Sequence, residues 1–181
     1  GVQVNYYYDG KQCIEERDAS GGVARQYVWG PGQDELVEER TGTNTWHAHR
    51  NGVGSVVAVT DGVSGAVVER YAYDPFGGTT VTSVGTPTGS PYRFHSAHFD
   101  SETGLYWMRA RHYSPSLGRF VQRDPSGIWA DDRQWGNPYV FAGNQGTNAV
   151  DRDGLKMYFE GDANHVKQFL MRVGWYAGLR L

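Results

Sequence analysis

The sequence predicts a mainly β protein built from short antiparallel strands joined by tight turns. Three observations lead to this prediction. Apolar and aromatic residues alternate with polar ones over short runs, which is the period of a half-buried strand. Turn-forming residues separate these runs at intervals of roughly 8 to 15 residues. The 25 glycines among 181 residues, with 12 tyrosines and 6 tryptophans, are typical of many strands and turns and not of a helical bundle.

The first strands are expected at the start of the chain. Residues 2–8 place valine and tyrosine at alternate positions, and Asp9-Gly10 follows them. This dipeptide predicts a hairpin, because both central residues of a type I′ turn need a positive φ. The partner strand covers roughly residues 12–17, and a third strand covers residues 23–29.

Two more strands are predicted at residues 54–60 and 65–73, on either side of an Asp-Gly turn. The segments 6–10 and 70–77 resemble each other, since each ends a strand with an aromatic residue, any residue and Tyr-Asp before a turn. A repeat of this kind must stack on its neighbours to bury its faces. The Thr-, Ser- and Gly-rich stretch 78–89 predicts a solvated loop or a flexible hairpin.

The character of the chain changes twice towards its end. Residues 91–155 are rich in aromatic residues and arginine, and glycines interrupt their strand patterns irregularly. Residues 162–173 place apolar side chains at i, i+3, i+4 and i+7, which predicts a short amphipathic helix. Residues 156–181 carry a net charge of +2, opposite in sign to the rest.

Composition excludes several classes of function. The net charge of −3 and a pI near 6.1 give no basic surface for nucleic acid. The mean hydropathy of −0.60, with no apolar run near 18 residues, predicts no membrane span. Cys13 is the only cysteine and permits no internal disulfide and no cysteine-built zinc site. The histidines show no metal-binding spacing on a helix, so we expect neither a metal nor a cofactor.

Six blocks of residues carry a recognisable pattern. They read YAYDPFG at 71–77, YRF at 92–94, GLYWMRARHY at 104–113, GRFVQRDPSG at 118–127, NPYVFAGN at 137–144 and DRDGL at 151–155. Together they resemble the YD-repeat proteins of the Rhs type, and the later blocks resemble the Rhs repeat-associated core.

The resemblance implies an architecture and a division of the chain. It implies a β-sheet strip that spirals into a hollow shell, closed by the associated core and enclosing a variable C-terminal segment. Residues 1–90 would then be shell strands, 91–155 the core, and 156–181 the start of a cargo or vestigial segment. Because the chain starts at Gly1 without an initiator methionine, we expect it to be a segment of a longer protein.

The resemblance also implies a self-cleaving aspartyl protease. Asp124 and Asp151 match the two aspartates of the family motifs, and the bond between Leu155 and Lys156 would be cut. Arg123 precedes the first aspartate directly. Arg111 and His112 occupy the positions where some family members carry an Arg-Asp pair, and these three residues would support the site. The chain departs from the family pattern at residue 152, where an arginine replaces the usual proline.

The chemistry of two carboxylates fits this role. Peptide cleavage needs one ionised carboxylate to activate water and one protonated carboxyl to assist the carbonyl or the leaving amine. Like charges held close together split their pKa values and so provide that pair. Asp124 and Asp151 are 27 residues apart, so only the fold could bring them together. The competing interpretation is that an aspartate before proline or glycine caps a turn, and that Arg111 is a charge partner or a cation–π donor.

Three functions remain open at this point. The first is the C-terminal part of a bacterial Rhs/YD-repeat polymorphic-toxin protein, exported to the cell surface or beyond. Its partners would be its own C-terminal segment as cargo, a secretion or toxin-complex component and an immunity protein. The second is a YD-repeat protein that does not cleave itself and serves in surface structure, adhesion or carbohydrate contact. The third is a ligand-binding β-domain of unrelated function.

Overall fold

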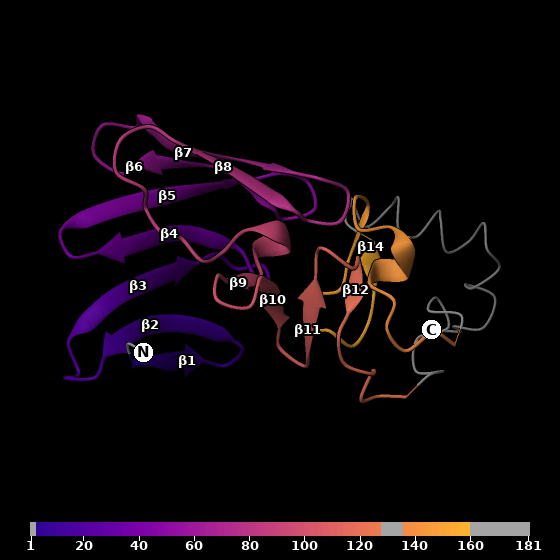
Figure 1. Ribbon diagram of the computed structural model, residues 1–181. Coiled ribbons are helices and arrows are strands. Elements are labelled where there is room, and N and C mark those ends of the chain that lie inside the picture. The colour runs from indigo at the N-terminus through magenta and orange to yellow at the C-terminus, as the bar shows by residue number, and fades with distance from the viewer. Residues whose placement is uncertain (1–2, 128–135, 160–181) are drawn as a thin grey trace, which may run out of the picture.

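An eight-stranded antiparallel sheet dominates the fold, in a computed structural model that describes residues 3–127 and 136–159. Its strands pair in the order of the sequence, and Figure 1 shows them following one another from the indigo N-terminus to magenta. The mainly β, antiparallel fold predicted from the sequence is confirmed. The strands are β1 (Val4–Asp9), β2 (Gln12–Asp18), β3 (Val23–Trp29), β4 (Leu36–Thr41), β5 (Asn44–Arg50), β6 (Val56–Asp61), β7 (Val67–Tyr73) and β8 (Thr79–Ser83). We call this sheet the strip.

A smaller four-stranded sheet lies beside one end of the strip (Figure 1). A two-stranded pair and two short 3₁₀ turns complete the described elements. The small sheet contains β9 (His98–Asp100), β10 (Leu105–Met108), β11 (Arg111–Ser114) and β12 (Arg119–Phe120); the pair is β13 (Ala149–Val150) with β14 (Tyr158–Phe159), and the turns are η1 (Phe94–Ser96) and η3 (Ala142–Asn144). The helix predicted at residues 162–173 lies outside the described residues. None of the described helices has the length and apolar character needed to cross a membrane.

Two strands of the strip carry no clear alternation in the sequence. β4 contains Glu38, Glu39 and Arg40 in succession, and β5 contains two histidines. The buried member of the charged run is Glu39, which accepts hydrogen bonds from Arg25 and from the Ser90 hydroxyl. β4 was missed because a carboxylate that is paired in the fold, that of Glu39, takes a position where the pattern expects an apolar side chain.

The first hairpin turn differs from the type I′ turn that Asp9-Gly10 predicted. Asp9 belongs to β1 and pairs with Gln12, so Gly10 and Lys11 are the central turn residues. Gly10 has φ +57°, and Lys11 is not among the residues with positive φ. A positive φ at the first central residue alone matches a type II′ turn, in which glycine is favoured at that position.

The stretch 78–89 is largely exposed, as expected of a solvated loop or hairpin, but it contains a strand and one buried threonine. Thr79–Ser83 form β8, which makes a hairpin with β7. Beyond it the chain crosses the face of the strip that buries Tyr27 and Val59, and Thr88 becomes buried. Glu69 on that face accepts hydrogen bonds from the Thr88 backbone N–H at 2.9 Å and from its hydroxyl. Composition did not predict the burial of Thr88, because its polar groups find their partner only in the folded chain.

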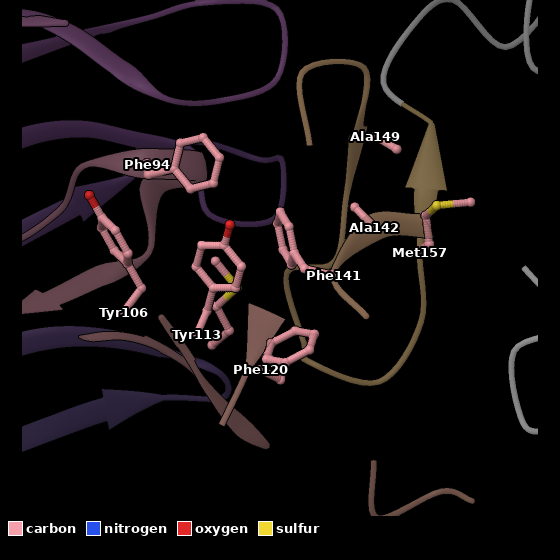
Figure 2. Close-up of a cluster of buried hydrophobic side chains, with 9 residues drawn as sticks. Phe94, Tyr106, Tyr113, Phe120, Phe141, Ala142, Ala149 and Met157 are labelled. Atoms are coloured by element: carbon pink, nitrogen blue, oxygen red, sulfur yellow. The ribbon is translucent and has the colours of Figure 1, made fainter. Parts of the chain in front are cut away.

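An aromatic core joins the small sheet to the last described segment. Figure 2 shows Phe94, Tyr106, Tyr113, Phe120 and Phe141 packed together, with Met157 at the far side beside Ala149. The rings of Tyr113 and Phe141 are 4.4 Å apart between centroids. Burial of each large aromatic side chain stabilises the fold by about 1.5–3 kcal/mol. This core holds β11 and residues 137–157 in a fixed relation, and the candidate site lies between them.

Candidate functional site

The two predicted aspartates meet at one arginine. Oδ2 of Asp124 and Oδ2 of Asp151 each lie 3.1 Å from Nη2 of Arg111, and all three side chains are 0% exposed. Removing three charged groups from water is costly unless each finds opposite charge and hydrogen bonds. The fold therefore brings together residues from β11, from the loop after β12 and from the turn after β13.

Arg111 is held on every side. Its guanidinium lies 3.6 Å from the ring centroid of Phe120, which gives a cation–π contact. Its Nε donates to the carbonyl of Gly154, and its Nη1 donates to the carbonyl of Pro138 at 3.0 Å. The structural role considered for Arg111 is thus present, and the same contacts place the guanidinium between the two carboxylates.

Asp151 binds the peptide that was predicted to be cut. Its Oδ1 accepts hydrogen bonds from the backbone N–H of Leu155 at 2.9 Å and of Lys156 at 3.0 Å. An ordinary turn aspartate in this chain behaves differently, since Asp74 accepts from residues two and four positions later. Burial raises the pKa of Asp151 to about 6, and the charge of Asp124 adds to this, against the lowering effects of Arg111 and the two N–H groups.

Asp124 caps a turn and also belongs to the buried cluster around Arg111. Its Oδ1 accepts hydrogen bonds from the backbone N–H of Ser126 at 2.8 Å and from the Ser126 hydroxyl, as a turn-capping aspartate does. Its Oδ2 faces Arg111. One oxygen therefore orders the local turn, and the other belongs to the buried cluster.

Gly154 shapes the turn that carries the predicted cut. It has φ +65°, and a Cβ at this position would lie 2.6 Å from the carbonyl oxygen of Met108. The backbone N–H of Ala110 donates to the carbonyl of Asp153 at 3.2 Å, so the turn packs directly against the β10–β11 hairpin. Leu155 is 37% exposed and Lys156 is exposed. The peptide between them therefore lies where buried carboxylates and solvent meet.

Two of the predicted supporting residues lie away from the cluster. The ring of His112 faces Gln122, whose Nε2 is 2.8 Å from its Nδ1, on the side of β11 opposite to Arg111. Arg123 is exposed, and across residues 3–127 and 136–159 no hydrogen bond or ion pair of its side chain is found. Neighbouring residues on a strand point to opposite faces, so adjacency to Arg111 or Asp124 does not bring a side chain into the site.

Sequence reasoning missed a second set of charged residues around the turn. Arg109 donates to Asp34, to the carbonyl of Arg152 and towards Asp153, and Lys11 also binds Asp153. Arg109 stood within a recognised block and could have been considered. Lys11 follows the predicted Asp9-Gly10 turn, and Asp34 lies in a loop that belongs to none of the six blocks. Their partners are 75 and 142 residues away in the sequence.

The part of the chain that the structure describes has no group of three or more His, Cys, Asp or Glu side chains arranged for a metal ion. His47 pairs with Glu38 at 3.3 Å, and His49 contacts the Thr60 hydroxyl at 3.0 Å. The chemistry of the candidate site is therefore that of two carboxylates, one guanidinium and the backbone between them.

Comparison with known proteins gives relatives for most of the chain. It is 33% identical over 157 residues to the tRNA3(Ser)-specific nuclease WapA of Bacillus spizizenii, a match covering 85% of this chain and 7% of WapA. It is 41% identical over 69 residues to the Toxin protein Tse5 of Pseudomonas aeruginosa, covering 38% of this chain and 5% of Tse5. No protein-family model matches the chain.

A solved structure, TcdB2-TccC3 without its hypervariable C-terminal region, has the same fold at a TM-score of 0.64 and 18% identity. The match covers 85% of this chain and 8% of that chain. The fold, an antiparallel strip with a smaller sheet beside it, is thus shared with a segment of a much longer solved chain. The sequence relatives, a nuclease and a toxin, are also much longer than this chain. Together with the motifs, the sequence relatives support assignment of the chain to the Rhs/YD-repeat family.

Proposed function

We propose that this chain is part of a toxin-type Rhs protein that cuts its own backbone between Leu155 and Lys156. The observation that carries the proposal is the hydrogen bond from the Lys156 N–H to Asp151, because it places a carboxyl group on the nitrogen that would leave. Asp124 lies across Arg111 from Asp151, so both carboxyl groups required for the reaction belong to one cluster.

The reaction is a hydrolysis of one peptide bond. Water adds to the carbonyl carbon of Leu155 while Asp124 accepts a proton from it. Asp151 gives a proton to the nitrogen of Lys156 and the C–N bond breaks. The new carboxyl group of Leu155 passes its remaining proton to the freed amine, so the products are a Leu155 carboxylate and a Lys156 ammonium. The pKa of about 6 supports Asp151 as the acid, since a protonated fraction is present near neutral pH. Because enzyme and substrate share one chain, proximity supplies much of the acceleration.

Arg111 is a positioning residue in this scheme. It holds both carboxylates and, through its Nε, the carbonyl of Gly154 next to the reacting peptide. His112 and Arg123 have no part in it, because their side chains lie elsewhere.

The wider role follows from the relatives. We assign residues 91–155 to the Rhs repeat-associated core, residues 1–90 to a shell and residues 156–181 to the start of a released segment. The nuclease WapA and the Toxin protein Tse5 support a toxic activity beyond the cut. Such a protein would act after export, with a toxin-complex component and an immunity protein as partners.

Intact mass spectrometry of the complete gene product tests the cleavage. We expect two pieces that divide between Leu155 and Lys156, and a single uncut chain for Asp124→Asn and Asp151→Asn. The matched control is Asp74→Asn, which alters a turn aspartate outside the cluster. A wild-type chain that stays whole would favour the structural or adhesive YD-repeat protein that does not cleave itself.

A further inference from the structure

We propose that Asp34, in the loop between β3 and β4 of the strip, positions the cleavage turn, residues 151–155, through Arg109. Cleavage then requires the β1–β2 and β3–β4 loops to be docked on this turn. The inference rests on the proposed self-cleavage and adds a requirement that the buried cluster alone does not impose. Five side chains from four segments carry it: Asp34 and Gln33, Lys11, Arg109 and Asp153.

Asp34 and Arg109 form a two-pronged ion pair. Nη1 of Arg109 lies 2.9 Å from Oδ2 of Asp34, and Nη2 binds Oδ1. Asp34 is only 8% exposed. Paired contacts of this kind fix the orientation of the guanidinium as well as its position.

Both residues adopt a backbone conformation that costs energy. Asp34 has φ +56° and Arg109 has φ +54°. Aspartate tolerates the left-handed region better than most residues, but arginine gains nothing there from its own side chain. Backbone strain of this kind persists only where surrounding contacts enforce it, and it gathers at functional positions. The ion pair is the contact that joins these two strained sites.

Arg109 transmits this constraint to the cleavage turn. Its Nη1 donates to the carbonyl of Arg152 at 2.7 Å and lies 3.3 Å from Oδ1 of Asp153. The strip adds two further contacts to Asp153, from Lys11 Nζ at 2.8 Å and from Gln33 Nε2 at 2.8 Å. The turn therefore contacts the β10–β11 hairpin on one side and the β1–β2 and β3–β4 loops on the other.

Arg152 and Asp153, which receive these contacts, are close in sequence to the reacting groups. They lie between Asp151 and the Leu155–Lys156 peptide. The N–H of that peptide donates its hydrogen bond to Asp151. Arg109 stands two residues before Arg111. If the strip were not docked, the turn would lose its contacts at Arg152 and Asp153, and the Lys156 N–H would lose its fixed position on Asp151. A displacement of about 1 Å in such a geometry lowers rates by as much as about a hundredfold.

Asp34→Asn in the complete gene product tests the proposal. Asparagine keeps the shape and tolerates the same φ, but it removes the charge that orients Arg109. We expect the rate of self-cleavage to fall about tenfold or more, with the pH dependence of the rate unchanged, because Asp34 takes no part in proton transfer. The matched control is Glu38→Gln. This variant removes the ion pair between Glu38 and Arg40, which also lies in the strip, and should change the rate of self-cleavage by less than about twofold.

Hydrogen exchange gives a readout that does not need cleavage. In an Asp124→Asn background, which keeps the chain whole, Asp34→Asn should speed exchange of the Leu155 and Lys156 amides about tenfold while the amides of β10 and β11 keep their protection. Lys11→Met offers a second variant in which unfolding is not expected, since the Lys11 side chain is 63% exposed; it should speed exchange of the same two amides.

The outcomes separate the two proposals. Wild-type rates and wild-type exchange in both Asp34→Asn and Lys11→Met would overturn the positioning role. Equal loss of protection throughout β10, β11 and the turn would also overturn it, because it would mean general destabilisation. If no version of the chain is ever cut, the proposed self-cleavage fails on its own, while localised exchange would still show the docking contacts.

Discussion

Asp151 accepts a hydrogen bond at 3.0 Å from the backbone N–H of Lys156, five residues further along the chain. Turn aspartates of the strip, such as Asp61 and Asp18, cap N–H groups two to four residues later and order a hairpin. Asp151 instead holds the far end of a wider turn and is itself buried beside Arg111. This difference in geometry separates a candidate proton donor from the many structural aspartates of the chain.

The rate of self-cleavage should depend on pH through Asp151. Its pKa is raised to about 6, so its protonated fraction falls roughly tenfold for each pH unit above that value. If Asp151 acts as the acid, the rate declines from pH 6 to pH 8. Densitometry of the two pieces over time measures it. A rate that instead rises through pH 6 would show Asp151 acting as a base and would reverse the assigned roles.

The free energy of unfolding of the uncut chain should also depend on pH through Asp151. The folded pKa of Asp151 exceeds its ordinary value of 3.8, so its contribution to the free energy of unfolding is fully present below about pH 4 and is lost as pH rises through 6. The loss amounts to up to about 3 kcal/mol. Urea unfolding at pH 4 and pH 7, in the Asp124→Asn background, measures it. Adding Asp151→Asn should remove this component, and an identical pH dependence in both proteins would contradict the prediction.

Replacing Arg111 should unfold or strongly weaken the core. Arg111→Met removes the guanidinium that lies 3.1 Å from both buried carboxylates, which costs about 3–5 kcal/mol. The comparison is Arg40→Met, where the side chain is 55% exposed in its pair with Glu38 and the cost should stay below about 1 kcal/mol. Equal midpoints of urea unfolding for the two variants would mean that the buried cluster contributes little.

Gly154 and Gly104 have similar φ values, so replacing each with alanine distinguishes the cost of the left-handed conformation from the cost of a steric contact. Gly154→Ala adds a Cβ 2.6 Å from the Met108 carbonyl, whereas Gly104→Ala, at φ +72°, meets nothing within 4 Å. Both variants should lose about 1 kcal/mol from the left-handed conformation. Only Gly154→Ala should also displace the turn and abolish cleavage, as followed by intact mass. Normal cleavage in Gly154→Ala would show that the turn tolerates a shift.

The two pieces should stay together after the cut. Met157 is 2% exposed within the aromatic core, and Tyr158–Phe159 pair with Ala149–Val150 (Figure 2). Burial of one large apolar side chain stabilises an association by about 1.5–3 kcal/mol. Size-exclusion chromatography should therefore show both pieces in one peak under native conditions and in two in urea. Met157→Ser should shift this separation to lower urea, and separation without denaturant would contradict the prediction.

Much of the strip could be predicted from local pattern. The segment 23–29 was predicted as a strand that ends at a Gly-Pro-Gly turn, and β3 covers the same residues. β4 escaped prediction because Glu39 faces the buried side and is satisfied by Arg25 and by Ser90, which lies 51 residues away. A pattern of apolar and polar letters does not record a partner that distant.

The site divides in a similar way. The motifs identified Asp124, Asp151 and the Leu155–Lys156 peptide as candidates, and the structure places all of them around Arg111. The ring of His112 lies away from the cluster, because strand alternation turns it to the other face of β11. Asp34 had no signal at all, since its loop matches no motif and its partner Arg109 is 75 residues away.

By itself, the sequence determined several strands and turns of the strip and the residue types able to perform carboxylate chemistry. These properties depend on neighbours a few positions apart. The tertiary structure alone decided that Asp124 and Asp151 share one guanidinium, that burial raises the pKa of Asp151, and that Asp34 reaches the cleavage turn. Distance and desolvation set the strength of a charge interaction, and both are fixed only when segments far apart in the sequence pack together.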